Sequence, residues 1–216
     1  MAFDVGIDFR QTSAYVSDPT NCTYCLGGVT DAYPVTRGGA TFGWNTWDSG
    51  NDLALNRSAS IDARLAGGSF IFNNSGTPNP PQLFEFDLPS AGTYTIVLAI
   101  GDANSPRAFV TVALYDNTSL LATIISGGTS TTGEFYDAAG NLWTTPAAWV
   151  SSNVGVNHTF ASTKLILKVG EISSGNYTAL AHLRVTAAGV TPSTDPPYKT
   201  SAQLPNQYFP DIVSTY

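Results

Sequence analysis

Hydrophobic and polar residues alternate with a period of two along much of this chain. The stretches YTIVLAI (residues 94–100) and FEFDL (84–88) place large apolar residues at every second position. Their inward positions are Tyr94, Ile96, Leu98 and Ile100 in the first stretch and Phe84, Phe86 and Leu88 in the second. Residues 109–116, 164–169 and 180–187 follow the same pattern. Since successive side chains of a strand point to opposite faces, the pattern predicts half-buried β-strands.

Turn-rich segments separate these strands, and no helical period is visible. NNSGTPNPPQ (73–82) and SGGTSTTG (126–133) are rich in residues that favour turns. Short strands joined by such turns predict an all-β fold, an antiparallel β-sandwich of the jelly-roll type. We expect it to occupy residues 1–189 as one domain, a size that all-β domains commonly reach. Residues 190–216 contain five prolines, which disfavour central strands and predict an extended C-terminal arm.

Charge is sparse in this sequence of 216 residues. Charged residues make up 12% of it and the net charge is −7, whereas soluble domains usually have about 25% charged residues. The nine Lys and Arg residues are scattered, so no basic patch is available to phosphates, and we expect no nucleic-acid partner. No apolar run approaches the length of a membrane span, and the first residues lack the layout of a signal peptide. We therefore expect no membrane association and, if the chain begins naturally at Met1, no export by the usual secretory route.

Cys22 and Cys25 form a CxxC motif. A structural zinc site needs four nitrogen or sulfur ligands, and the other candidates, His158 and His182, lie far along the chain. A redox motif would be expected at a strand-to-helix junction, and no helical period is visible here. We interpret the cysteines as two loop thiols, and these residues predict no metal or other cofactor.

The histidines do not predict a catalytic site. His182 falls on the outward side of a predicted strand, beside Arg184, and His158 lies in a loop or at a strand start. Ser-His-Asp chemistry needs a histidine presented in a cleft. The aspartates of residues 48–62 alternate with arginines, which indicates internal charge-assisted hydrogen bonds. Because no nucleophile elbow, phosphate loop or metalloprotease helix is present, we expect a protein that is not an enzyme.

Several short motifs together resemble a known group of proteins. They are VGIDF (5–9), GW (43–44), NR (56–57), DAR (62–64) and FEFDLPSAGTYTIVLAIGD (84–102). Their order is similar to that in galactose-binding-like and malectin-like carbohydrate-binding modules. The resemblance covers residues 3–187 and implies a jelly-roll sandwich whose edge loops bind sugars in many relatives, sometimes with a structural calcium ion. The C-terminal arm has no counterpart in that group.

Eight residues on predicted loops are candidates for binding a sugar. Sugars present C–H faces and hydroxyl groups, so their sites combine exposed aromatic rings with Asp, Asn and Arg. The candidates are Trp47, Asp48, Asn51, Arg57, Tyr24, Trp143, Asp102 and Asn104. Trp47 is the best candidate for an exposed ring, and each of the eight has a structural alternative. For Trp44 and Arg64 we expect that structural role: Trp44 closes the core at the end of the sandwich, and Arg64 together with Asp62 clamps the loop to the next strand.

Three classes of function compete for this sequence: structural protein, carbohydrate-binding module and enzyme. The low charge, the Ser-, Thr-, Ala- and Gly-rich surface, the missing signal peptide and the arm favour a structural protein on the outside of a large assembly. A bacteriophage virion is the expected setting, as a capsid decoration, head or tail-fibre protein. The alternative is a carbohydrate-binding module of a secreted or cell-surface protein, which six Asn-x-Ser/Thr triplets would also fit.

The arm is the part of the sequence most informative about partners. Proline lowers the entropy that an extended segment loses on docking, and aromatic rings fill shallow pockets. We expect the arm to contact neighbouring capsid or tail subunits through Tyr198, Tyr208, Phe209 and Tyr216. Further copies of this chain are expected partners in the assembly, and a host-surface glycan is the expected ligand. The alternative is an arm that wraps back onto its own sandwich.

Overall fold

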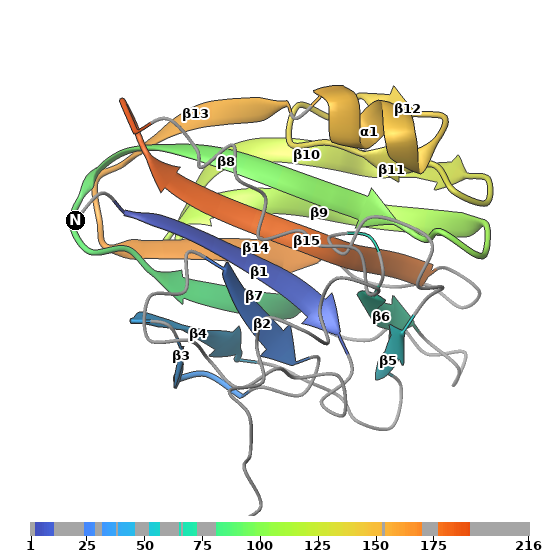
Figure 1. Cartoon of the computed structure of the whole chain (residues 1–216). Helices are drawn as coiled ribbons and strands as arrows, with labels where there is room; N and C mark the ends of the chain where they lie inside the picture. The colour runs from blue at the N-terminus through green and yellow to red at the C-terminus, as the bar shows by residue number, and fades with distance from the viewer. Residues whose placement is uncertain are drawn as a thin grey trace, which may run out of the picture.

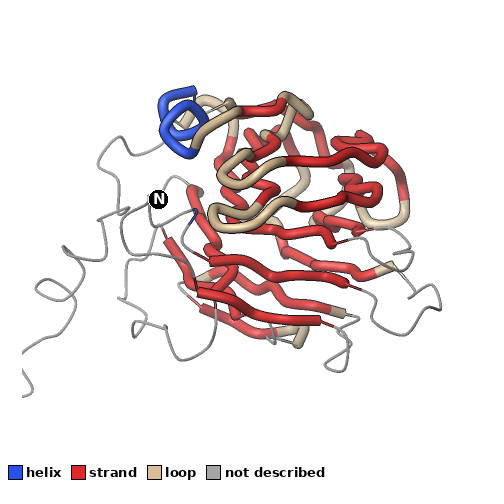
Figure 2. Tube along the Cα trace, turned by 90° about the vertical axis from the view of Figure 1, so that its right-hand side faces the viewer, coloured by secondary structure: helices blue, strands red, loops and turns tan. Residues whose placement is uncertain are grey.

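Two β-sheets packed face to face make up the described part of the chain (Figure 1). This computed structural model describes residues 3–10, 24–28, 32–37, 39–45, 52–56, 65, 67–72, 81–152, 154–169 and 177–190. A view turned by 90° shows the strands in layers, with a short helix on their outside (Figure 2). The antiparallel β-sandwich that the sequence predicts is confirmed.

Sheet A holds nine strands within the described ranges. They are β1 (Asp4–Arg10), β2 (Tyr24–Gly28), β5 (Asp52–Asn56), β6 (Gly67–Phe72), β8 (Gly92–Gly101), β11 (Phe135–Tyr136), β12 (Leu142–Trp143), β13 (Gly155–Phe160) and β15 (Tyr177–Ala187). Their order is β12-β11-β8-β15-β1-β2, while β13 also pairs with β8, and β6 pairs with both β15 and β5. The β1–β2 pair is parallel, and the other described pairs of this sheet are antiparallel.

Sheet B has six strands in the described residues, and all of its pairs there are antiparallel. They are β3 (Val35–Arg37), β4 (Ala40–Trp44), β7 (Gln82–Asp87), β9 (Arg107–Asp116), β10 (Ser119–Ser130) and β14 (Lys164–Val169). The order is β10-β9-β14-β7-β4-β3. Its register places Lys164 opposite Asp87 and Ile166 opposite Glu85. The outward side chains of β14 therefore lie near the middle of the outer face of this sheet.

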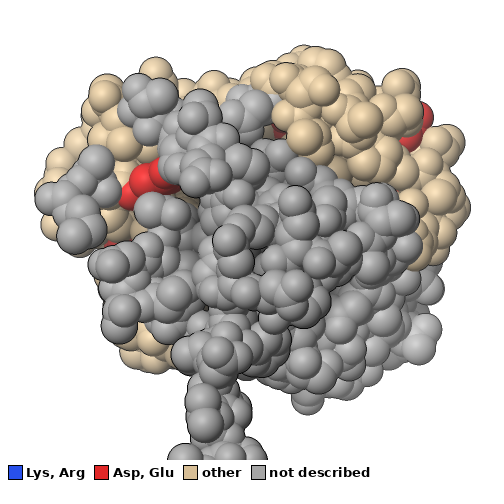
Figure 3. Space-filling model, in the orientation of Figure 1, with Lys and Arg blue, Asp and Glu red and all other residues tan. Residues whose placement is uncertain are grey.

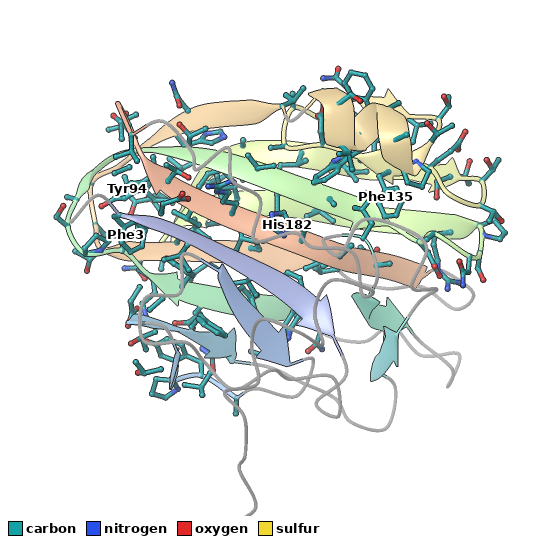
Figure 4. All side chains as sticks on the ribbon, in the orientation of Figure 1. Phe3, Tyr94, Phe135 and His182 are labelled. Carbon is teal, nitrogen blue, oxygen red and sulfur yellow. The ribbon has the colours of Figure 1, made fainter. Side chains whose placement is uncertain are left out.

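The core lies between the two sheets and is built from the alternating apolar residues. The inward positions predicted in residues 84–88, 94–100 and 164–169 are at most 4% exposed. Phe3 and Tyr94 lie side by side at the left of Figure 4, and their ring centroids are 5.9 Å apart. The period-two pattern therefore identified the core-facing residues of these strands correctly.

Trp44 closes the core, as the sequence predicts. Its residue is 1% exposed. Its ring centroid lies 5.3 Å from that of Phe84 and 6.0 Å from that of Phe9. The loop clamp expected from Asp62 and Arg64 lies outside the described residues.

A short helix, α1 (Pro146–Ser152), covers part of the outer face of sheet A. Its sequence did not reveal it, because seven residues are too few to show a helical period. Trp149 on this helix is 1% exposed and donates its indole N–H to the carbonyl of Leu98 at 3.0 Å. His182 on β15 is consequently 0% exposed, with its ring 6.1 Å from that of Trp149 (Figure 4). The outward side of this strand thus faces a second apolar cluster there and not water.

Three residues expected in loops, Tyr24, Cys25 and Trp143, belong to strands. Tyr24 begins β2 and pairs with Gly6, Cys25 follows it in the same strand, and Trp143 is the last residue of β12. His158, expected in a loop or at a strand start, lies inside β13. The prediction of two loop thiols is therefore wrong for Cys25. Pairing with β1 makes this segment a strand although its sequence lacks an alternating side-chain pattern. Cys22 lies outside the described residues.

Candidate functional site

Most of the predicted sugar-binding loop lies outside the described residues. This holds for Trp47, Asp48, Asn51 and Arg57, and also for the arm residues Tyr198, Tyr208, Phe209 and Tyr216. Of Tyr24 only the backbone is described. The structure places the three remaining candidates, Asp102, Asn104 and Trp143, at the end of the sandwich where β8 finishes and β12 lies two strands away.

Asp102 holds the turn between β8 and β9 together. Its side chain is 0% exposed and forms an ion pair with Arg107. It also accepts the backbone N–H of Asn104 at 2.9 Å, while the residue Asn104 itself is exposed. The carboxylate of Asp102 is therefore used inside the protein, and of the two candidates in this turn Asn104 is the exposed one.

Trp143 is fixed by a buried carboxylate. Its indole N–H is donated to Asp137 at 2.7 Å, and Asp137 is 0% exposed. The same carboxylate accepts the backbone N–H groups of Ala139 at 2.8 Å and Asn141 at 3.0 Å. Trp143 packs against the second apolar cluster below α1. Its polar atom and part of its ring thus serve the structure of the β11–β12 hairpin.

A second group of polar side chains gathers on the outer face of sheet B. We call it the Tyr33 cluster, and it consists of Tyr33, Asn45, Glu85, Asp87 and Lys164. Tyr33 and Lys164 are half-buried, the side chain of Asp87 is 37% exposed, and Asn45 is exposed. An aromatic ring, two carboxylates, an amide and an ammonium group therefore meet at one accessible place.

Gly43 allows Tyr33 to reach this face. Its φ is +147°, and a Cβ atom at this position would lie 2.6 Å from the backbone nitrogen of Tyr33 and 2.8 Å from the carbonyl carbon of Ala32. The backbone N–H of Tyr33 is donated to the carbonyl of Trp44 at 3.0 Å. Residues 32 and 33 thus lie directly against β4 because the glycine has no side chain.

The strand register supplies the charged members of the cluster. Lys164 Nζ lies 2.8 Å from Asp87 Oδ1 and 3.0 Å from Glu85 Oε2. The hydroxyl of Tyr33 donates to both carboxylate oxygens of Asp87 at 3.0 Å and accepts from Lys164 at 2.5 Å. Asn45 Nδ2 donates to Glu85 Oε1 at 2.5 Å. Hydrogen bonds therefore hold every side chain of the cluster in a defined position.

Lys164 is kept in its charged form. Partial burial lowers the pKa of Lys164, but hydrogen bonds to Asp87, Tyr33 and Glu85 outweigh burial and raise this pKa above its usual value. Its Nζ also lies 4.0 Å from the centroid of the Tyr33 ring, a cation–π distance. Since a protonated amine is neither a nucleophile nor a base, the cluster can bind polar groups and lacks an activated lysine.

The sequence pattern did not reveal this cluster as a site. Glu85, Asp87 and Lys164 are outward residues of correctly predicted strands, but Tyr33 belongs to no alternating stretch. The available signal was Gly43, a glycine between two large aromatic residues in a strand, which marks the close approach of another backbone.

The described residues include no helix that is long and apolar enough to cross a membrane. In the same ranges, no three His, Cys, Asp or Glu side chains come together in a way that could hold a metal ion. The structural calcium ion that some relatives carry stays an expectation of the family resemblance.

Comparison with known proteins gives structural neighbours only. No protein-family model and no curated protein matches the chain. A crystal structure of protein YXIM from Bacillus subtilis is 18% identical, with 85% of this chain and 40% of that chain covered and a TM-score of 0.49. This chain thus spans less than half of that protein.

Two further neighbours are smaller. A family 35 carbohydrate-binding module from Clostridium thermocellum is 14% identical, with 73% of this chain and 100% of that chain covered and a TM-score of 0.34. The family 32 module of C. perfringens NanJ, solved in complex with galactose, is 14% identical, with 68% and 92% covered and a TM-score of 0.34. Both of these neighbours are carbohydrate-binding modules by name, and at 14% identity the likeness concerns the fold alone.

Proposed function

We propose that this chain is a non-catalytic glycan-binding β-sandwich, and that the Tyr33 cluster contacts the sugar. The proposal rests on one observation: the Tyr33 ring lies beside the partly exposed carboxylate of Asp87 and in the same cluster as the exposed residue Asn45, which supplies an amide group. A sugar offers C–H groups to an aromatic surface and hydroxyl groups to carboxylate and amide groups. The side chains already hold their positions through mutual hydrogen bonds, so little side-chain entropy is lost on binding.

The charge and apolar surface favour a sugar over other ligands. In the orientation of Figure 1, which has sheet A toward the viewer, the coloured surface shows no Lys or Arg and so adds no basic patch on that side (Figure 3). Within the Tyr33 cluster, two carboxylates and one ammonium group leave one net negative charge, which disfavours phosphate groups. Of the described residues, the large hydrophobic ones that are exposed are Leu120 and Leu142, so these ranges offer no broad apolar patch for a protein partner.

The arrangement of the carboxylates supports binding and not hydrolysis. A glycosidase needs one carboxyl group that donates a proton and a second that remains ionised. Glu85 and Asp87 both contact the ammonium group of Lys164, at 3.0 and 2.8 Å. Both carboxylates are thus held by the same cation, which gives them one shared role and not the two different roles that a glycosidase needs.

A glycan array followed by titration tests the proposal. Asp87→Asn keeps the shape of the side chain but removes its charge, and a hydrogen bond to a charged group contributes about 1.5–3 kcal/mol. We expect the best array ligand to bind roughly ten- to a hundredfold more weakly to this variant. Because the ion pair is partly exposed, the melting temperature should change by less than roughly 4 °C. Glu134→Gln, at the β10–β11 turn, is the matched control and should bind like the wild type.

We propose that the setting is the outer surface of a large assembly, with a bacteriophage virion as the leading case and a secreted or cell-surface protein as the alternative. Support comes from the sequence of residues 190–216, whose five prolines and four aromatic residues fit an arm that docks on a neighbour. Deletion of residues 190–216 should leave a folded, glycan-binding protein that no longer joins the assembly. Unchanged incorporation, or collapse of the isolated fold, would count against the arm.

A further inference from the structure

The outer face of sheet B continues beyond the Tyr33 cluster. The register places Tyr115 of β9 opposite Ile166 of β14, and Ile166 opposite Glu85 of β7. Residues opposite each other point to the same face, so these three side chains form a row across the strands. With neighbouring strands about 4.8 Å apart, β9 and β7 are separated by roughly 10 Å. Tyr115 and Ile166 are half-buried and keep part of their surface accessible.

Tyr115 repeats the pairing of tyrosine with lysine found in the cluster. Lys168 Nζ lies 5.7 Å from the centroid of the Tyr115 ring, as Lys164 Nζ lies 4.0 Å from that of Tyr33. Leu120, which is 55% exposed, faces Tyr115 from β10 and continues the row. Two aromatic positions with a polar group beside each are thus joined by the apolar side chain of Ile166.

We infer that the glycan bound by this protein is an uncharged chain of several sugar units, lying across sheet B from the Tyr33 cluster to Tyr115. The inference rests on the proposed function and adds the length, direction and charge class of the ligand. Aromatic rings at two separate places favour a ligand that offers C–H surfaces at several points along its length, as a chain of sugar rings does. A single sugar unit would contact only one of the two positions.

The charges of this face favour an uncharged chain. Glu85, Asp87, Lys164 and Lys168 contribute two negative and two positive charges to it. The protein as a whole carries a net charge of −7, which repels polyanions at a distance. A broad protein partner is disfavoured because Leu120 is the large hydrophobic residue that is exposed on this face in the described ranges.

Calorimetric titration with neutral gluco-, xylo-, manno- and galacto-oligosaccharides of one to six units tests the inference. We expect the affinity of the wild type to rise at least tenfold between one unit and four. Tyr115→Ala should remove this gain and leave the single-unit affinity unchanged, whereas Asp87→Asn should weaken both. Tyr136→Ala, which removes a half-buried tyrosine in sheet A, is the control and should keep the gain.

The outcomes separate this inference from the proposed function. Equal affinity for one and six units, or a gain in affinity that survives Tyr115→Ala, would overturn the extended site. The proposed function would still be supported if Asp87→Asn weakened the binding of a single sugar unit. Tighter binding of an oligogalacturonate than of any neutral oligosaccharide would overturn the charge class. If Tyr115→Ala fails to fold, Lys168→Ala provides the second test and should reduce the chain-length gain at least threefold. Absence of binding to every glycan would overturn both proposals.

Discussion

Replacing Gly43 by alanine should disturb the binding face from below. The new Cβ atom would meet the backbone of residues 32 and 33 at 2.6–2.8 Å, and no side-chain rotation can relieve a clash with a backbone. The φ of +147° adds backbone strain, which costs of the order of 1–3 kcal/mol. Since 1 kcal/mol lowers the melting temperature of a domain of this size by about 2–4 °C, we expect a fall of roughly 2–12 °C.

The same substitution should also weaken glycan binding. Displacement of Tyr33 removes its ring from the site and frees Asp87 from two hydrogen bonds. If the glycan loses the equivalent of one hydrogen bond, about 1.4 kcal/mol, its affinity should fall about tenfold. Gly39→Ala is the control, because Gly39 has a φ of +76° but a Cβ there would meet nothing within 4 Å. Calorimetric titration of both folded variants with the best array ligand compares their glycan affinities. Wild-type affinity in Gly43→Ala, or an equal loss in Gly39→Ala, would refute the role given to the close approach.

Three further predictions concern charges and buried hydrogen bonds. Folding raises the pKa of Lys164 above 10.5. In chemical denaturation, the loss of stability caused by Lys164→Met should therefore be constant from pH 6 to 9 and should shrink as the pH rises beyond 10.5. A loss that already shrinks at pH 8 would contradict the ion-pair assignment. The hydrogen bond from Ser162 lowers the pKa of Asp116 below 3.8 despite burial. The difference in free energy of unfolding between wild type and Asp116→Asn should therefore be largest at neutral pH and disappear as the pH falls below 3.8. Trp143→Phe removes the indole N–H bound to Asp137 and should cost about 1–2 kcal/mol in urea unfolding, with no change in glycan affinity at the Tyr33 cluster.

Much of the sandwich could be predicted from single strands of the sequence. Residues 164–169 show why, because Leu165, Leu167 and Val169 alternate with polar or half-buried neighbours and all three are buried. The helix α1 could not be predicted in this way, since its seven residues are too short to show a period. His182 was placed on the outward side of its strand, but its burial depends on Trp149 from that unpredicted helix.

The candidate site depends on relations between strands that one sequence does not display. Asp102 and Trp143 were recognised as candidates on predicted loops, but their partners Arg107 and Asp137 could not be assigned without the turns that bring them together. Tyr33 is in the cluster because residues 32 and 33 lie on Gly43, and because β14 lies beside β7. Strand order and register are therefore the information that the sequence pattern lacked.

The most direct test of glycan binding at the Tyr33 cluster is a map of backbone amide chemical shifts during titration with the best array ligand. We expect the largest changes in residues 43–45, 84–87 and 164–168, which form and flank the cluster, and little change at the other end of the sandwich. Changes confined to residues 102–106 and 137–145, at the end that carries Asn104 and Trp143, would contradict the account.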